Sequence, residues 1–508
     1  MDFEGSGLLT ITLFLPLVGA MLIALFVAKD KSVRWVAGVT IVLELVLSIV
    51  VFLRYDLGEG GVQLVDRWTE WIPVESFPIE YFLGVDGLSA PLVLLTGLLG
   101  FAAVFASWSI KERVREYFVW LLVLQTAVMG VFMALDFILF FLMWELEMVP
   151  MFFLISIWGT GRKEYSAMKF LIFTFLGSAF MLVGILVLFF STGTFDMTAL
   201  PEALQGATLI APSGLVFTLI FVAFAVKLPV WPLHTWLPDA HTDAPTAVSI
   251  MLAGVLLKMG GYGMLRVSAT MFPDVIVDAA RILIVLGVIN VIYGAIITLR
   301  QTDMKRLVAY SSISHMGYVL VGISSVAGVA GVVSPTGLTG AAMQMFTHGT
   351  ITGLMFLMVG LTYEKVHTRH IPDLGGLATR MPVIAIGFMI AGLASLGLPG
   401  TSGFVAEILI FLGTFPVWSW WTGIAAFGVV ITAGYILWML QRTMFGPQIP
   451  RFSNVRDATK MEMVPIAVLV AAVLVVGIYP AIITDFFTEG LTDIVDSIQQ
   501  SAQLAMTR

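Results

Sequence analysis

The chain has 508 residues, of which 59% are hydrophobic and only 12% are charged. This apolar content exceeds the roughly 45–50% of soluble domains, and apolar runs recur along the whole chain, so a polytopic membrane protein is expected. There is no cysteine, which excludes disulfides, cysteine-bound zinc and iron–sulfur clusters on this chain. The formal net charge of −7 says little about partners, because the distribution of charge matters more than its sum in such proteins.

Apolar runs of about 18–25 residues predict an all-α membrane protein with about fourteen spanning helices. The runs are continuous and lack period-two alternation, which favours helices over a β-barrel. No soluble domain or linker interrupts them. The predicted spans lie near residues 7–28, 33–53, 84–108, 117–134, 136–157, 165–191, 213–236, 244–266, 280–299, 305–326, 337–363, 381–413, 421–445 and 462–483.

Alternate loops between these spans differ in charge. One set of loops carries Lys29, Lys31, Arg34, Lys111, Arg113, Arg115, Arg162, Lys163, Arg300, Lys305, Arg306, Lys365, Arg369, Arg380, Arg442, Arg451, Arg456 and Lys460. The opposite set has only Arg54, Arg67, Arg266, Arg281 and Arg508. Its longest loop is acidic, with Asp56, Glu59, Asp66, Glu70, Glu75 and Glu80. The positive-inside rule predicts that the first set is cytoplasmic and that both termini lie outside.

The most informative stretch is FAVKLPVWPLHTWLPDAHTDAP, within the seventh predicted span. Its lysine, Lys227, costs on the order of 2.5–3.5 kcal/mol at the centre of a spanning helix. Pro229 and Pro232 remove backbone donors and clash with the preceding turn, so the helix is expected to break there. Because a broken helix at membrane depth survives only inside protein or beside water, this stretch predicts a functional site.

A second broken span is predicted late in the chain. The run GLASLGLPGTSGFVAEILIF is interrupted by Gly397, Pro399 and Gly400, and Glu407 follows inside the membrane. Matched interruptions five spans apart suggest two inverted repeats with their sites near the midplane. The predicted units are residues 1–112 with spans 1–3, residues 113–270 with spans 4–8, residues 271–448 with spans 9–13, and residues 449–508 with the last span and a short tail.

Ionisable residues inside spans are functional candidates by default. Glu145 and Glu147 lie on one helix roughly 200° apart, so at most one of them faces a given neighbour. We favour Glu145 as the functional carboxylate and keep Glu147 as a secondary candidate. Lys227 and Lys258 are the lysines deep in predicted spans, and a nearby carboxylate would change how tightly each holds its proton. A structural ion pair is the alternative for both.

Histidines offer relay groups between these charges, because imidazole titrates near neutral pH. The candidates are His234, His315 and His348, although a lone histidine in a bundle is more often simply hydrogen-bonded. His241 is a secondary candidate for proton uptake or a plain loop residue.

Other acidic residues have simpler explanations. Glu44 is expected to be structural or near lipid. Asp86, Asp136 and Asp303 lie at span ends, where capping of a helix is the simpler role. No nucleotide-binding loop, metal-ligand spacing or nucleophile elbow is present, so no metal or cofactor site is expected. Movement of charge therefore remains the predicted activity.

With these residues identified, the sequence resembles the antiporter-like subunits of respiratory complex I, and among them the M-type (chain 4-type) members. The resemblance covers nearly the whole chain. Its most specific stretches are LPDAHTDAPTAVSIMLAGVLLKMGGYGMLR, TDMKRLVAYSSISHMGYVLVGI and ASLGLPGTSGFVAEILI. Glu407 favours the M type, because the L and N types typically have lysine at this terminal position. The absence of a long lateral helix after the last span also favours it.

The resemblance implies fourteen helices, two inverted five-helix repeats and a central polar line through the membrane. It implies that Glu145 pairs with Lys227, that Lys258 connects the halves and that Glu407 ends the line. His234, His315 and His348 fall at relay positions, whereas Glu147 has no assigned counterpart. NADH, FMN, iron–sulfur clusters and quinone are expected on other subunits and no cofactor on this chain.

These observations predict a proton-translocating membrane-arm subunit of an NADH:quinone oxidoreductase. The expected partners are other membrane-arm subunits, including neighbouring antiporter-like subunits, and lipids, but not nucleic acid. The expected location is a bacterial cytoplasmic membrane in preference to the mitochondrial inner membrane. Two alternatives stay open: a subunit of a multisubunit cation/proton antiporter, and a structural spacer that pumps nothing.

Overall fold

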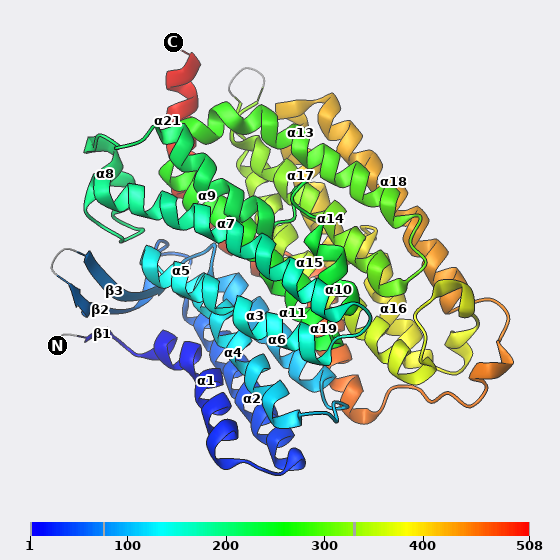
Figure 1. The fold of residues 1–508 in the computed structure, drawn as a ribbon. Helices are drawn as coiled ribbons and strands as arrows, with labels where there is room; N and C mark the ends of the chain where they lie inside the picture. Colours follow the sequence, from blue (N-terminus) through cyan, green and yellow to red (C-terminus); the bar gives the residue numbers. More distant parts are fainter. Residues whose placement is uncertain (1–2, 75–76, 329–331, 507–508) are drawn as a thin grey trace.

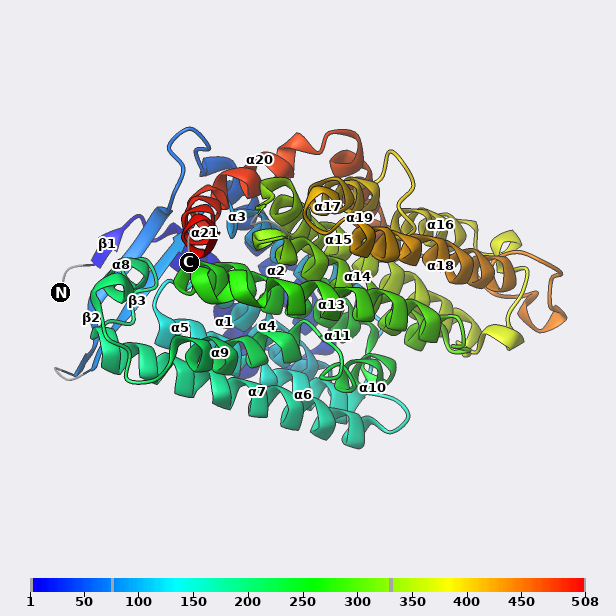
Figure 2. The ribbon, with the colours of Figure 1, turned by 90° about the horizontal axis from the view of Figure 1, so that it is seen from above.

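The structure is a computed structural model that describes residues 3–74, 77–328 and 332–506. Glu75 and Arg508 of the charge pattern lie outside these residues. Long helices run side by side along one common direction, and a small sheet beside the N-terminus lies at one end of the bundle (Figure 1). The view from above shows the same order, with the strands and α8 at one end and loops at the other (Figure 2).

The helices and strands follow the chain with few long connections. They are β1 (Phe3–Gly5), α1 (Leu8–Phe26), α2 (Asp30–Arg54), β2 (Gln63–Val74), β3 (Phe77–Val85), α3 (Ala90–Ala106), α4 (Val114–Met133), α5 (Phe137–Leu146), α6 (Met148–Trp158), α7 (Lys163–Thr192), α8 (Leu200–Gly206), α9 (Ser213–Lys227), α10 (Trp236–Asp243), α11 (Thr246–Met251), α12 (Leu257–Gly263), α13 (Pro273–Thr298), α14 (Met304–Ile323), α15 (Pro335–Val366), α16 (Pro382–Ser395), α17 (Ser402–Trp418), α18 (Trp420–Thr443), α19 (Lys460–Ile478), α20 (Ala481–Gly490) and α21 (Thr492–Met506). Two π-helical stretches, Leu252–Leu256 and Met264–Ala269, flank α12, and Ile371–Asp373 forms a short 3₁₀ turn.

The expected helical membrane class is confirmed. In the described part of the chain, 11 helical segments are long and apolar enough to cross a membrane. The other three predicted spans coincide with α3 and with two interrupted helices, α9–α10 and α16–α17. The helices in these three spans are shorter than the predicted spans, because a helix break or a loop occupies the rest of each span. The total of fourteen spans therefore stays a prediction, as does the division into inverted repeats.

A three-stranded antiparallel sheet replaces the long acidic loop expected after the second span. The strand sequence QLVDRWTEW does not alternate strictly between apolar and polar residues, and the pairing of β2 with β3 is interrupted by register shifts between Gln63 and Asp66 and between Trp68 and Ile72. Asp66 of β2 accepts hydrogen bonds from the backbone nitrogens of Gly7, 2.7 Å, and Thr10, 2.9 Å, and so caps the start of α1. Arg67 pairs with Glu80 at 2.6 Å and with Asp196 at 2.9 Å, which joins the sheet to the loop before α8.

Burial divides the helices into an inner and an outer group. The 18-residue apolar windows of the α11–α12 span and of α15 are completely buried, and that of α14 is 94% buried. By contrast, only 28% of the window of α19 is buried, and α1, α2, α7, α13 and α18 also present apolar side chains outward. Polar groups on the inner helices are therefore surrounded by protein rather than lipid.

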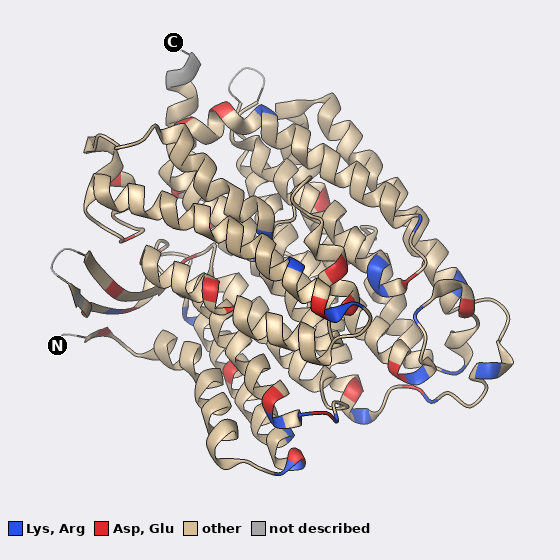
Figure 3. Ribbon diagram, in the orientation of Figure 1, with Lys and Arg blue, Asp and Glu red and all other residues tan. Residues whose placement is uncertain are grey.

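Charged residues gather mainly at the helix ends far from the sheet (Figure 3). Both basic and acidic residues are found at these ends (Figure 3). A few charges lie in the middle of the bundle instead (Figure 3).

Helices α15 and α17 approach each other closely at glycine residues. A Cβ atom on Gly413 of α17 would lie 2.2 Å from the backbone nitrogen of Gly337 in α15. A Cβ on Gly340 of α15 would lie 2.7 Å from the backbone nitrogen of Ile410 in α17. Small residues at such crossings allow the backbones to approach in a membrane bundle. The α15–α17 crossing therefore depends on glycine, and it carries His348 and Glu407.

We predict that Gly413→Ala destabilises the folded chain by about 1–3 kcal/mol, because the added methyl group meets backbone that cannot move aside cheaply. Gly423→Ala in α18 is the matched control, since nothing lies within 4 Å of its Cβ position. The thermal denaturation midpoint of the assembled complex is the measurement. Equal midpoints for the two variants would contradict the close crossing.

Candidate functional site

The first predicted helix break is confirmed, and its free backbone groups are satisfied by neighbours. Helix α9 ends at Lys227 and α10 begins at Trp236. Asn290 of α13 accepts from the backbone nitrogen of Trp231 at 2.7 Å and donates to the carbonyl of Pro229 at 3.1 Å. The indole of Trp236 donates to the carbonyl of Val226 at 3.0 Å. A break at this depth is stable because protein groups replace the lost helical hydrogen bonds.

Lys227 forms a buried ion pair at this break, and the partner is Glu147. The side chains of Lys227 and Glu147 are 1% and 0% exposed. The expected pairing with Glu145 is therefore wrong. Glu147 lies at the junction between α5 and α6, where its carboxylate reaches Lys227 of α9, whereas Glu145 lies in the last turn of α5. Glu145 is half-buried and lies against Ser178 of α7 instead.

The ammonium of Lys227 is also surrounded by aromatic faces. It lies 5.4 Å from the ring centre of Trp144 and 5.6 Å from that of Phe170. Both distances fall within the range of cation–π attraction. One oxygen of Glu147, Oε2, has no hydrogen-bond partner among the described residues. The carboxylate thus keeps one site at which it can accept a proton or a further donor.

Lys258 occupies an irregular part of its span. It lies in α12 between the two π-helical stretches, a geometry that is frequent at functional sites. Its Nζ donates to the carbonyl of Ala253 and lies 2.7 Å from Nδ1 of His348. Two residues further on, a Cβ at Gly260 would lie 2.6 Å from the backbone of Phe224 and Leu228. The Lys258 helix is therefore packed directly on the end of α9, where Lys227 lies.

A second cluster extends from Lys258 to Glu407. The rings of His348 and His315 have centres 5.5 Å apart. His315 lies 3.1 Å from the hydroxyl of Ser395 through Nε2 and 3.9 Å from Oε1 of Glu407 through Nδ1. Gln344, at 3.5 Å from Nδ1, borders the same ring. The tertiary structure thus brings together four predicted site residues: Lys258, His348, His315 and Glu407.

A small cavity lies between these groups. It is lined by His315, Gln344, His348, Ile351, Ala394, Ser395, Gly403 and Glu407. The space open to the centre of a water molecule is about 10 Å³, roughly the volume that one water needs. The gap between His315 and Glu407 is slightly too long for a direct hydrogen bond, so a bridging water fits the geometry.

The second predicted break is confirmed as well, and it positions Glu407. Helix α16 ends at Ser395 and α17 begins at Ser402. Gly397 has φ of +76°, which favours glycine. A Cβ at this position would lie 2.4 Å from Oε2 of Glu407, so a larger residue would displace the carboxylate. The break thus gives the acidic group room inside the bundle.

The remaining histidines lie at the margins of these clusters. Nε2 of His234 is 3.2 Å from the hydroxyl of Tyr293 in α13, and Nδ1 has no partner among the described residues. His241 is not a loop residue: it lies in α10, is completely buried and stacks on Phe356 with ring centres 4.7 Å apart. Both of its ring nitrogens lack partners in the described part of the chain.

Some polar residues of the site were not predicted. Lys305 was counted only as a loop cation, yet it is 5% exposed and donates to the carbonyl of Ala244. Asp303 caps α14 through the backbone nitrogens of Lys305 and Arg306, so Lys305 belongs to the first helical turn. The cap does not specify that Lys305 turns inward, because its partner Ala244 is distant in sequence. The same holds for Asn290, whose partners Pro229 and Trp231 are also distant.

The other acidic residues largely follow expectation. Asp136 and Asp303 are N-caps, as predicted. Asp86 accepts from the backbone nitrogens of Leu88 and Ser89 and also pairs with Arg266. Glu44 is fully buried and accepts from Gln125 at 2.8 Å, which supports a structural role over a position near lipid.

The fold and the buried line of ionisable groups define an antiporter-like membrane subunit. Residues 134–432 match the family described as "NADH:quinone oxidoreductase/Mrp antiporter, TM". This match spans more than half of the chain, and the chain belongs to that family.

Full-length comparisons agree with the family assignment. The chain is 41% identical to NADH-quinone oxidoreductase subunit M of Rhodobacter capsulatus, with 97% of each chain covered. It is similar to a chain of respiratory complex I from Thermus thermophilus with bound NADH, with a TM-score of 0.85, 27% identity and 98% and 99% coverage. The Mrp complex from Dietzia sp. shares the fold with a TM-score of 0.83 at 18% identity and similar coverage, 98% and 99%.

We predict that Glu147→Gln lowers the stability of the assembled complex by about 3–5 kcal/mol, because it leaves the Lys227 charge buried without its carboxylate. Glu145→Gln is the matched control and is expected to cost less than about 1 kcal/mol, since Glu145 has no ion pair in the described structure. The midpoint of thermal denaturation is the measurement.

A double variant tests the same pair independently of general damage. Adding Lys227→Met to Glu147→Gln removes the unpaired charge and is expected to recover most of the lost stability. A double variant less stable than Glu147→Gln alone, or an equal loss for Glu145→Gln, would show that the ion pair is assigned wrongly.

Proposed function

We propose that this chain is a proton-translocating subunit in the membrane arm of an NADH:quinone oxidoreductase. The observation that carries the proposal is the pair of buried ionisable clusters, each beside a broken helix: Glu147 with Lys227, and Lys258 with His348, His315 and Glu407. Intramembrane charges are costly, and they persist where ions or protons move. The 41% identity with a subunit M over 97% of both chains supports the assignment to this enzyme class.

The first cluster would act as the switch. A carboxylate beside a lysine stabilises the charged ammonium, so movement of Glu147 away from Lys227 would change how the first cluster holds its proton. A change of a few kcal/mol in this interaction exceeds the roughly 2.3 kcal/mol that one charge needs per 100 mV. Glu145, in the last turn of α5, would connect this switch to the state of a neighbouring subunit.

The second cluster would carry the proton onward. Lys258 contacts His348 directly, and the histidine rings adjoin each other before Glu407. Imidazole accepts a proton on one nitrogen and releases it from the other, which suits a relay. Glu407 would release the proton to the far side. His234 would supply protons to the first cluster, and His241 would supply them to Lys258. Their positions at the edges of the two clusters favour these roles.

The proposed orientation follows the charge pattern. The helix ends that carry most basic residues would face the cytoplasm of a bacterium, with both termini on the opposite side. The redox reaction, with NADH, FMN, iron–sulfur clusters and quinone, would take place on other subunits. Neighbouring antiporter-like subunits and lipids would cover the exposed apolar helices.

A cation/proton antiporter subunit is the competing assignment, and the shared fold with the Mrp complex keeps it in view. The acidic Glu407 and the much higher identity to a subunit M favour the oxidoreductase. Copurification with quinone-reducing subunits separates the two. A spacer without transport would have no reason to bury three lysines and four histidines.

We predict that Lys227→Met reduces proton pumping per quinone reduced by about ten-fold or more, because the switchable proton carrier is removed. The matched control is Lys31→Met, which removes an exposed lysine from the start of α2. Acidification of membrane vesicles is compared with the rate of quinone reduction. Unchanged pumping in the Lys227→Met complex would count against the switch.

Glu407→Gln is predicted to impair release of the proton while electron transfer from NADH to an artificial acceptor remains normal, since that reaction does not use this chain. Pumping should fall by a similar factor, about ten-fold. Thr12→Val is a structural control, because Thr12 is buried in α1 and its hydroxyl donates to the carbonyl of Leu8. Full pumping by Glu407→Gln would remove Glu407 from the pathway.

A further inference from the structure

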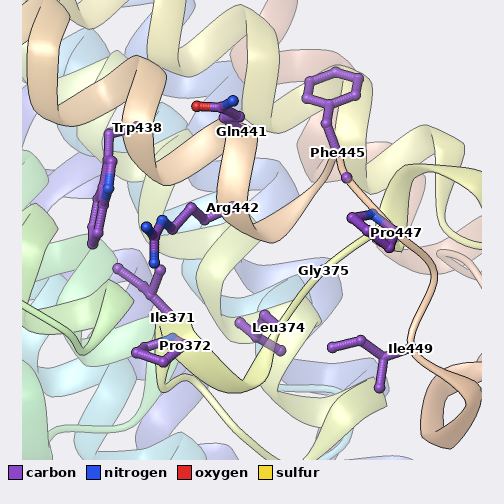
Figure 4. A pocket seen from close by; sticks show the side chains of 11 residues that line it. Ile371, Pro372, Leu374, Gly375, Trp438, Gln441, Arg442, Phe445, Pro447 and Ile449 are labelled. Carbon is purple, nitrogen blue, oxygen red and sulfur yellow. The ribbon is translucent and has the colours of Figure 1, made fainter.

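A hollow lies on the surface far from the buried clusters, where α18 ends. Its walls come from the turn at Ile371–Gly375, the last turn of α18 and the segment that continues to Ile449 (Figure 4). Its volume is about 470 Å³, within the usual range of small-molecule sites. None of the proposed proton-carrying residues lines it.

The walls of this hollow are held together by backbone hydrogen bonds. The nitrogen of Gly376 donates to the carbonyl of Phe445 at 2.9 Å, and the nitrogen of Ala378 donates to that of Met444 at 2.8 Å. Within the turn, the nitrogen of Leu374 donates to the carbonyl of Ile371 at 3.1 Å. The site is therefore formed before any ligand arrives, which lowers the entropic cost of binding.

One side of the hollow is cationic and polar. Arg442 projects into it between Trp438 and Ile371, and Gln441 adjoins it (Figure 4). The guanidinium carbon is 5.1 Å from the Trp438 ring centre, which orients the side chain. Arg442 makes no ion pair or side-chain hydrogen bond with the described residues. Asp373, the acidic residue of the adjacent turn, is engaged by His370 at 3.2 Å.

The other side of the hollow is apolar. Ile371 and Leu374 form its floor, and Phe445, Pro447 and Ile449 form its rim (Figure 4). Phe445 is 44% exposed even though it is aromatic. A ligand that satisfies this site needs an anionic group for Arg442 and a hydrocarbon portion for the apolar wall.

The position in the fold identifies the source of such a ligand. Helix α18 is one of the 11 apolar segments of membrane-spanning length in the described structure, and Arg442 lies in its last turn. Arginine and tryptophan at the end of a spanning helix lie at headgroup level. Arg442 is also at the helix ends where the basic loops gather, and these face the anionic leaflet in the proposed orientation.

We propose that this hollow binds one anionic phospholipid. The headgroup phosphate takes the planar fork of the Arg442 guanidinium, with Gln441 as a second donor. The first part of an acyl chain covers the apolar wall from Leu374 to Phe445. Arginine suits this role because its five donors match phosphate oxygens while its face stays on Trp438.

The test uses the whole purified complex in mild detergent, stripped of endogenous lipid and titrated with phosphatidylglycerol or phosphatidylcholine. Native mass spectrometry counts the lipid that is retained. We expect phosphatidylglycerol to bind the parent complex more tightly, and Arg442→Gln to weaken that binding about five-fold, as for one basic residue at a membrane surface. Arg442→Lys should give an intermediate loss.

The matched control is Arg456→Gln, an exposed arginine of the following loop that does not line the hollow. An equal loss in this variant would show diffuse attraction and overturn the site. Equal retention of both lipids would overturn the phosphate contact, and displacement of phosphatidylglycerol by free glycerol phosphate alone would overturn the acyl-chain contact. Release of a neighbouring subunit by Arg442→Gln, without a change in lipid, would assign the hollow to a protein contact. Lipid retention is independent of pumping, so the outcome does not depend on the proposed function.

Discussion

The ammonium group of Lys227 is buried inside the helix bundle, where a charge is unfavourable without polar or charged neighbours. Much of the surrounding structure supplies those neighbours. Glu147 supplies the counter-charge, while Trp144 and Phe170 offer their ring faces. The break after Lys227 frees backbone groups that Asn290 and Trp236 satisfy. Removing one partner of a buried ion pair strongly destabilises the folded protein, because the other charge is left buried without a counter-charge. The helices that carry Lys227 and its partners must therefore keep their relative positions.

The second break meets the same constraint differently. Glu407 has no lysine beside it in the described structure; its neighbours are His315, the Gly397 backbone and a cavity of roughly one water. The first break thus lies beside a buried ion pair, whereas the second lies beside a carboxylate, two histidines and a small cavity.

Helix packing joins the two clusters. The Lys258 helix lies against the end of α9 at Gly260, and its π-helical stretches aim the lysine toward His348 rather than Lys227. The buried Lys305 and His241 lie beside this junction, at the side of the basic loops. The two clusters are therefore adjacent, yet each has its own set of contacts in the described structure.

The sequence by itself determined the helical class, both breaks and most buried ionisable residues, because apolar length, proline and intramembrane charge are local signals. The small sheet was not predicted, because the sequence of β2 has no strict alternation of apolar and polar residues. Which carboxylate meets Lys227 was decided only by tertiary structure. Glu145 and Glu147 lie two positions apart in one predicted span, and the junction between α5 and α6 brings Glu147 into ion-pair contact with Lys227. The inward turn of Lys305 and the support from Asn290 likewise depend on partners far away in the chain, which no local pattern specifies.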